Sequence, residues 1–170
     1  MSRESRTPTL LREIMLRRYL RLGEEHTIAE IMGFLSDPHF KQDGLPYLVV
    51  IRRNGTLAGM LPPKAILRVL APGAASASGN AADFLAAAAG KLSVTAGEIM
   101  DRDTPVLSPD DSLEAAYRCI RKTATDVIAL VEEERVVGLV TARILFETAS
   151  RLTVGSLSGG VIPPSEAGPE

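Results

Sequence analysis

The chain has 170 residues, 45% of them apolar and 24% charged, which suits one compact domain or two small ones. Its single cysteine, Cys119, excludes an intramolecular disulfide framework and a thiolate metal cluster, so we expect a reducing, cytoplasmic environment. The longest nearly apolar run is far shorter than the roughly 20 residues that cross a bilayer, and no signal-peptide core follows the amino terminus. We therefore expect neither membrane insertion nor export.

Charge is spread unevenly along the chain. Residues 1–70 carry a net charge of +4 and residues 71–170 one of −6. A basic amino-terminal face could attract phosphate or nucleic acid. However, acidic residues are interspersed among its arginines, and aromatic residues, which would stack on bases, make up only 4% of the chain. We therefore favour a solvated surface over a nucleic-acid interface.

The first elements in the chain are a helix and a strand. Thr7 followed by Pro8 is typical of an N-cap and a first helical residue, and predicts a helix over about 8–17. A short strand follows at 19–22.

A second helix begins at a capping box formed by Thr27 and Glu30. It should end near Pro38. Its apolar residues recur with helical spacing and should share one buried face: Ile28, Ile31, Met32 and Leu35.

An apolar strand over 47–51 leads into a hairpin. Asn54-Gly55 favours a type I′ turn, in which both central residues have positive φ, and joins this strand to another at 56–61. A helix then starts at Pro62 or Pro63 and should turn Ile66, Val69 and Leu70 inward.

Small residues over 71–80 predict a linker, because they cannot bury enough apolar area to offset the entropy lost on ordering. A short helix over 81–89 should stop at Gly90, and Thr95 with Glu98 forms another capping box. The tail from Ser156 should be mobile.

The sequence after the linker repeats the sequence before it. Residues 136–146 read as a short strand, a glycine and a helix entry, and residues 57–67 read the same way 79 positions earlier, with Gly59 matching Gly138. Farther upstream in each copy, four of five residues match between 13–17 and 98–102, which are 85 positions apart. About six extra residues around 37–46 in the first copy account for the difference between the two offsets.

The second copy follows the order of the first. A strand at Val106 and Leu107 precedes a helix that Asp111 and Ser112 cap, a hairpin of strands 127–131 and 136–140 turns tightly at Glu133-Glu134, and a helix runs from 141 to about 152. The apolar face expected for the capped helix consists of Leu113, Ala116, Tyr117 and Ile120.

Each copy is therefore predicted to be an α/β (α+β) unit of βαββα order. The helical crossover makes its first two strands parallel, and the hairpin adds an antiparallel third. A unit of roughly 60 residues buries only about 60% of its unfolded surface, so we expect the copies to pack sheet to sheet with pseudo-twofold symmetry. The clefts where they meet are the default ligand sites.

These residues resemble a known family. An Ile-Met segment, a short strand, a capped helix and then Val-Val-Gly-Leu-Val-Thr leading into a helix look like the cystathionine beta-synthase (CBS) domain, here as the tandem pair called a Bateman module. The resemblance gives 1–70 as the first repeat with an amino-terminal helix, 71–95 as linker with a short helix, 96–153 as the second repeat and 154–170 as tail.

The resemblance implies a regulatory function. Such pairs bind adenosine-containing ligands such as AMP, ATP or S-adenosylmethionine between the repeats, require no cofactor, and associate with a second module into a disc. Family members that bind adenine nucleotides carry a hydroxyl residue for phosphate and, three positions later, an Asp for ribose. This chain has Thr141 but Ile144 in the second copy, and Pro62 and Ala65 in the first. Neither copy has the ribose acid, which should weaken binding without forbidding it.

The resemblance also suggests the contact residues, each of which has a simpler interpretation. Thr141 could meet a phosphate but is above all an N-cap, and Arg143 could reach a phosphate or simply be solvated. The remaining candidates could contact adenine, sugar or phosphate, or be plain strand-edge and surface residues: Thr104, Val106, Asp126 and Val127 for the second cleft, and Tyr19 with Lys64 for the first.

The sequence gives little support to a catalytic function. His26 and His39 are the only histidines, and no metal-ligand spacing or nucleophile motif is present. Two functions stay open: a stand-alone sensor of an adenosine-type ligand, and a ligand-free dimerisation or interaction scaffold that kept the fold but lost the site. We expect a homodimer through the helices in either case, with a protein target still to be identified.

Overall fold

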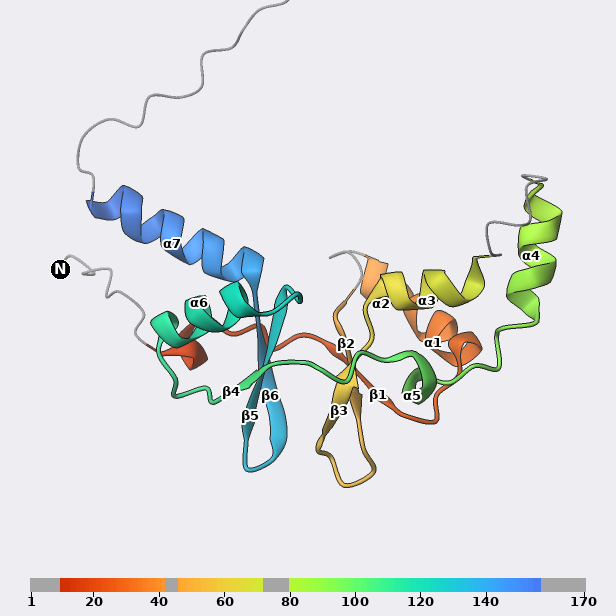
Figure 1. Ribbon diagram of the computed structural model, residues 1–170, viewed down its shortest axis with the longest axis horizontal. Coiled ribbons are helices and arrows are strands. Elements are labelled where there is room, and N and C mark those ends of the chain that lie inside the picture. Colours follow the sequence, from red (N-terminus) through yellow and green to blue (C-terminus); the bar gives the residue numbers. More distant parts are fainter. Residues whose placement is uncertain (1–9, 42–45, 72–79, 157–170) are drawn as a thin grey trace, which may run out of the picture.

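The computed structural model describes residues 10–41, 46–71 and 80–156, and contains two three-stranded sheets (Figure 1). In the first sheet β1 (Leu20–Gly23) pairs in parallel with β2 (Leu48–Ile51), which pairs antiparallel with β3 (Leu57–Met60). The expected crossover and hairpin topology of the first copy is therefore confirmed.

The second sheet repeats this topology. β4 (Val106–Leu107) is parallel to β5 (Val127–Glu132), which is antiparallel to β6 (Arg135–Thr141). Both hairpins carry a bulge at the same place, so that one extra residue precedes Gly59 in β3 and Gly138 in β6. The mixed α/β class with two copies of one unit is thus confirmed.

Helices connect and flank the strands. Their bounds are η1 (a 3-10 turn, Leu11–Glu13), α1 (Ile28–Leu35), α2 (Pro38–Lys41), α3 (Pro63–Leu70), α4 (Ala81–Ala89), α5 (Ala96–Ile99), α6 (Leu113–Lys122) and α7 (Ala142–Ser156). α3 and α7 lie at the end of the molecule opposite the two hairpin tips (Figure 1). α4 flanks α3, and Ala88 packs on the first core.

Side chains cap these helices as the sequence predicts. The Thr27 hydroxyl accepts the Glu30 N–H, and the Glu30 carboxylate accepts the Thr27 N–H at 2.8 Å. The Thr95 N–H donates in the same way to Glu98 at 2.8 Å, and Ser112 caps α6. Each cap supplies partners for backbone N–H groups that the first helical turn leaves without any.

The structure differs from the expected helix over 8–17. Within the described part of that range only the short 3-10 turn η1 forms, and Leu16 then makes a bridge to Leu139 of the second repeat. The Met15 N–H still donates to the Leu11 carbonyl at 3.0 Å, but no helix continues from there, because the backbone N–H and carbonyl of Leu16 pair with Leu139 instead. The expected cap at Thr7 and Pro8 lies outside the described residues, as do all but the two ends of the linker expected over 71–80 and all but the first residue of the tail expected from Ser156. α7 continues to Ser156, beyond the end expected near Leu152.

Two finer expectations were also wrong. Met32 is 45% exposed, so the buried face of α1 consists of Ile28 and Ile31, with Leu35 partly covered. At the first hairpin only Gly55 has positive φ (85°), and the Gly55 N–H donates to the Arg52 carbonyl at 2.8 Å. The turn is a three-residue loop closed by a left-handed glycine, which needs one positive φ and not two.

The two sheets pack against each other through a shared inner core. Val49 and Met60 come from the first sheet and Ala129, Val136 and Leu139 from the second. A separate outer core lies between each sheet and the helices of the same repeat. The three cores together bury apolar side chains on both faces of each sheet, which is the arrangement expected for repeats that cannot fold alone.

The segment before each repeat crosses over and packs on the other repeat. The Leu16 and Leu139 backbones exchange hydrogen bonds of 2.8 and 2.9 Å, and those of Asp101 and Met60 exchange bonds of 2.7 and 2.9 Å. Leu11 lies in the core of the second repeat and Ala96 in that of the first. These contacts are related by the pseudo-twofold axis, so each half of the molecule contains a piece of the other copy.

The two matching glycines lie where these segments cross the strands. A Cβ on Gly59 would overlap the Asp101 carbonyl, and one on Gly138 would lie 2.5 Å from the Met15 sulfur. Met15 and Met100 are themselves equivalent residues of the repeated Ile-Met segment. The glycine and the Ile-Met segment therefore match between copies because they contact each other across the two repeats.

Candidate functional site

The candidate residues of the second repeat gather at one end of its sheet. Val127 begins β5 and is paired with Thr141, the last residue of β6, while the Asp126 carbonyl accepts the Ala142 N–H at 2.8 Å. β4 is parallel to β5, so Thr104, two residues before β4, lies toward the same end. Strand pairing thus places the second-repeat candidates toward one end of the second sheet: Thr104, Val106, Asp126, Val127, Thr141 and Arg143.

Thr141 is buried, with 3% of its surface exposed. Its hydroxyl oxygen accepts the Ile144 N–H at 3.1 Å and so caps α7. A hydroxyl has one hydrogen and two lone pairs, so this bond leaves the hydrogen able to donate. The position therefore has a structural function in the described chain whether or not a ligand approaches it.

Three candidates of this group are open to solvent. Val106 is 48% exposed on β4, and Asp126 is exposed before β5. Arg143 is exposed in the first turn of α7, where its Nε donates to Glu147 Oε1 at 2.9 Å. An apolar side chain, a carboxylate and a guanidinium are thus exposed toward this end of the sheet. Thr104 is partly covered, and its hydroxyl donates to the Asp101 carbonyl at 3.4 Å.

The two candidates of the first repeat have different surroundings. The Tyr19 hydroxyl donates to the Val136 carbonyl of the second repeat at 3.1 Å and accepts from Arg21, whose guanidinium carbon lies 5.4 Å from the Tyr19 ring centroid. Tyr19 also packs on the core between the sheets. Lys64 is exposed in the first turn of α3, and the structure shows no hydrogen bond or ion pair between Lys64 and Tyr19. Tyr19 therefore joins the repeats.

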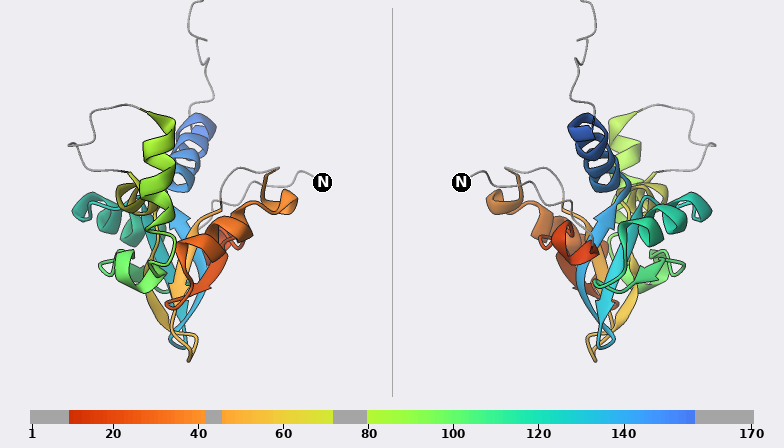
Figure 2. Two further views of the ribbon diagram at one scale, coloured as in Figure 1. Left: turned by 90° about the vertical axis from the view of Figure 1, so that its right-hand side faces the viewer. Right: turned by 90° about the vertical axis from the view of Figure 1, so that its left-hand side faces the viewer.

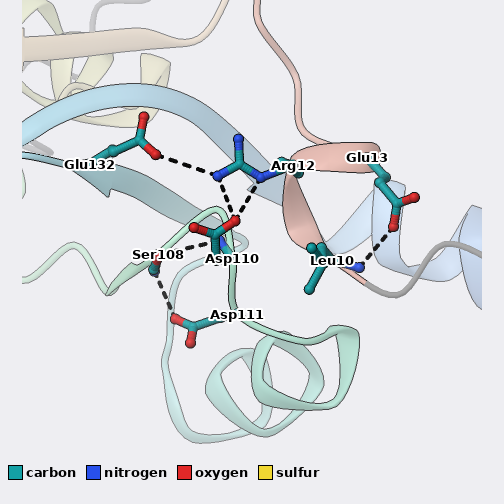
Figure 3. Close-up of polar contacts among 7 residues, drawn as sticks. All are labelled: Leu10, Arg12, Glu13, Ser108, Asp110, Asp111 and Glu132. Atoms are coloured by element: carbon teal, nitrogen blue, oxygen red, sulfur yellow. Dashed lines mark hydrogen bonds and ion pairs between the residues drawn. The ribbon is translucent and has the colours of Figure 1, made fainter.

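An ion-pair cluster that the sequence did not predict holds the segment before the first repeat against the second repeat. The Arg12 guanidinium donates to the Asp110 carboxylate, 2.7 Å from Nε, and lies 3.4 Å from Glu132 Oε1 (Figure 3). The hydrogen bond to Asp110 is the main cause that raises the pKa of Arg12 above its ordinary value. No sequence pattern pointed to this cluster, because Arg12 precedes the repeated Ile-Met segment and the equivalent residue in the second copy is Gly97.

Other site classes find no support in the described chain. Among residues 10–41, 46–71 and 80–156, no three His, Cys, Asp or Glu side chains are grouped so that they could hold a metal ion. Within the same residues no helix combines the length and apolar character needed to span a bilayer. Partial burial raises the pKa of the Cys119 thiol, which disfavours the reactive thiolate.

Comparisons with known proteins find a family model that matches part of the chain. Residues 96–150 match the model of the CBS domain. A search of curated proteins finds no match.

Solved structures match most of the chain. A CBS domain-containing protein from Kribbella flavida is 20% identical with a TM-score of 0.66, over 84% of this chain and 99% of that one. CBSX2, solved in complex with AMP, is 15% identical with a TM-score of 0.61, over 86% of this chain and 99% of that one. The cytosolic domain of the Mg²⁺ channel MgtE, solved with ATP, is 21% identical with a TM-score of 0.58, over 79% of this chain and 46% of that one.

Proposed function

We propose that this chain, whose residues 96–150 form a CBS domain within the fold of a tandem CBS pair, is a non-catalytic regulatory module that binds an adenosine-type ligand between its repeats. The ligand class comprises AMP, ATP and S-adenosylmethionine. Binding would change the geometry of the module and so alter its contact with a protein target. No cofactor is required for this function.

The observation that carries the proposal is the group of exposed side chains at the end of the second sheet. Val106 offers apolar surface to a base, Asp126 a carboxylate to hydroxyls or an amino group, and Arg143 a cation to phosphate. Two proteins of the same fold were solved with adenine nucleotides, CBSX2 with AMP and the MgtE domain with ATP. These likenesses support the ligand class, while the residues of this chain set its affinity.

The missing ribose acid should make that affinity low. Ile144 follows Thr141 by three positions and cannot accept hydrogen bonds from ribose hydroxyls. A hydrogen bond to a charged group contributes about 1.5–3 kcal/mol, which corresponds to about ten- to a hundredfold in the dissociation constant. We therefore expect binding at concentrations well above those of family members that carry the acid.

The second candidate is a ligand-free interaction scaffold, and the surroundings of Thr141 favour it. The hydroxyl that could meet a phosphate is buried and caps α7, and the equivalent position in the first repeat is Pro62, which has no hydroxyl. A pair that had lost its ligand would keep such a threonine for the cap alone. In both candidates the module self-associates through its helices, and its target is a protein.

A thermal-shift screen separates the two. The purified chain is heated with AMP, ADP, ATP, S-adenosylmethionine or NAD, and a sensor should melt several degrees higher with one of them, since a ligand at 100 times its dissociation constant adds about 2.7 kcal/mol. Thr141→Ser, which keeps the hydroxyl and the cap, should retain the shift, and Thr141→Ala should reduce it. A cooperative melt that no ligand moves would favour the scaffold.

A further inference from the structure

Arg143, the cation of the candidate site, already has an anionic partner on its own helix. It lies in the first turn of α7, which follows the end of the second sheet away from the hairpin tips (Figure 2). Its Nε donates to Glu147 Oε1 at 2.9 Å, and the two side chains are 84% and 54% exposed. Both groups are therefore open to a ligand, and a phosphate that approaches Arg143 meets a guanidinium whose charge a carboxylate partly offsets.

A second carboxylate belongs to the residue beside the start of the same helix. The Asp126 carbonyl accepts the Ala142 N–H at 2.8 Å, so Asp126 is held next to the residue that precedes Arg143, and its side chain is exposed. A guanidinium has five N–H groups, and Glu147 uses the one on Nε. The Nη groups of Arg143 can therefore still donate to one phosphate, in the presence of two carboxylates.

The first repeat has no acid at the equivalent positions. The residues 79 positions before Arg143, Glu147 and Asp126 are two cations and an aromatic residue, all exposed: Lys64, Arg68 and Tyr47. α3, which carries the two cations, follows its sheet as α7 follows the second one. The same places in the fold thus accept cations, so the fold itself does not require an acid there. The two acids instead change which ligands the second repeat favours.

These charges should discriminate between ligands by their number of phosphates. A terminal phosphate group carries about 1.5 to 2 negative charges at pH 7, and each further phosphoryl group of a nucleotide adds to that charge. One phosphate can share Arg143 with Glu147, whereas additional phosphates bring more negative charge toward Glu147 and Asp126. Repulsive charges of this kind give specificity against a competing ligand without any new contact to the preferred one.

We propose that Glu147 is a specificity-determining residue of the candidate site, and that its pairing with Arg143 makes the site prefer a nucleoside monophosphate over the di- and triphosphate. The inference rests on the proposed function, because it concerns the ligand class of the same site. Glu147 acts through the charge that it places beside Arg143 and needs no contact with the base or the sugar. The expected order of affinity, from tightest to weakest, is AMP, ADP and ATP.

Titration calorimetry with AMP, ADP and ATP tests the proposal, in EDTA so that no divalent cation neutralises the phosphates. The wild type should bind AMP about tenfold more tightly than ATP. Glu147→Gln keeps an acceptor for Arg143 but removes the charge, so it should tighten ATP about fivefold and AMP about twofold. Glu147→Arg, which introduces the charge of the first repeat, should abolish the preference. Glu114→Gln removes a carboxylate from another exposed pair four residues apart, with Arg118 on α6, and is the matched control that should leave all three affinities unchanged.

Three results would overturn the proposal. A preference for AMP that Glu147→Gln leaves unchanged would exclude a role for Glu147 without affecting the sensor function. ATP bound as tightly as AMP or more tightly would indicate that Arg121 and Lys122, exposed at the end of α6, reach the additional phosphates. No saturable heat with any of the three nucleotides would also contradict the proposal. Titration with S-adenosylmethionine, which has no phosphate, would then show whether the sensor function stands or falls with it.

Discussion

Gly59 and Gly138 are equivalent residues, but the atoms around them differ. The nearest atom to a Cβ on Gly59 is a backbone oxygen, of Asp101, whereas the nearest atoms to one on Gly138 belong to the Met15 side chain. A methionine can move aside, and a carbonyl in a two-way backbone pair cannot. Gly59→Ala should therefore destabilise the fold by about 3 kcal/mol and Gly138→Ala by about 1 kcal/mol. Urea unfolding of both variants measures this, and equal costs would mean that the crossing segments are equally adaptable.

The helix-capping glutamates give the fold a dependence on pH. Hydrogen bonds from the Thr27 backbone N–H and hydroxyl lower the pKa of Glu30, and those from Thr95 lower the pKa of Glu98. When folding lowers the pKa of a carboxyl group, that group stabilises the folded state, and the contribution is fully present above the pKa of the unfolded state, about 4.3 for glutamate. The contribution is lost as the pH falls through the lower pKa of the folded state.

Replacing both glutamates should flatten that dependence. The Glu30→Gln, Glu98→Gln double variant should lose less melting temperature than the wild type between pH 6 and pH 3, because it has fewer charged caps to protonate. Glu134→Gln, at a hairpin tip where no helix begins, is the matched control and should follow the wild-type curve. Parallel curves for all three proteins would show that other carboxylates govern the acid response.

The turn of the second hairpin contains residue types that are unusual for its backbone conformation. Glu133 and Glu134 have φ of 49° and 65°, so this two-residue turn has two positive φ values, which normally require Asn and Gly. Glu133→Asn with Glu134→Gly should stabilise the fold by about 1 kcal/mol, since a left-handed conformation costs most non-glycine residues about that much. Glu133→Gln with Glu134→Gln controls for the lost charges. A urea midpoint no higher than that of this control would contradict the strain argument.

Element prediction from the sequence succeeded where local chemistry decides the structure. The capped helices and the hairpins follow from side chains within a few residues of one another, as at Thr27 with Glu30. The helix over 8–17 was wrong because its residues meet a strand more than 100 positions away, at Leu139. The type I′ turn was wrong at Asn54 because a three-residue loop satisfies the same hairpin with Gly55 alone in the left-handed region.

The two repeats should unfold together, because the segment before each repeat packs on the other repeat. Leu11 is fully buried in the core of the second repeat, although the chain then continues into β1 of the first. Leu11→Ala should cost about 3 kcal/mol, and hydrogen exchange should report the loss in β2 as well as in β5. Met32→Ala, which removes a side chain that is 45% exposed on α1, is the control. Destabilisation confined to β5 would mean that the repeats fold independently.

The candidate site could be predicted only in part from the sequence. The position of its residues follows from the strand topology, whereas their contacts depend on side chains that packing brings close from elsewhere in the chain. The family resemblance suggested Asp126, Val127 and Thr141 as candidates, and the pairing of β5 with β6 brings them to one end of the second sheet. No pattern near Tyr19 in the sequence indicates that its hydroxyl donates to Val136 of the other repeat, because that contact depends on how the sheets pack. Whether these residues bind a ligand stays a proposal.

Titration calorimetry of the chain with AMP, ATP and S-adenosylmethionine tests the central claim most directly, with Arg143→Ala and Lys64→Ala as a matched pair. Both residues are exposed at equivalent positions of the first helical turn after each sheet. Binding between the repeats at the end of the second sheet predicts saturable heat with one of the ligands, weakened about tenfold by Arg143→Ala and unchanged by Lys64→Ala. No saturable heat with any of them at millimolar concentration would contradict the sensor and leave the interaction scaffold.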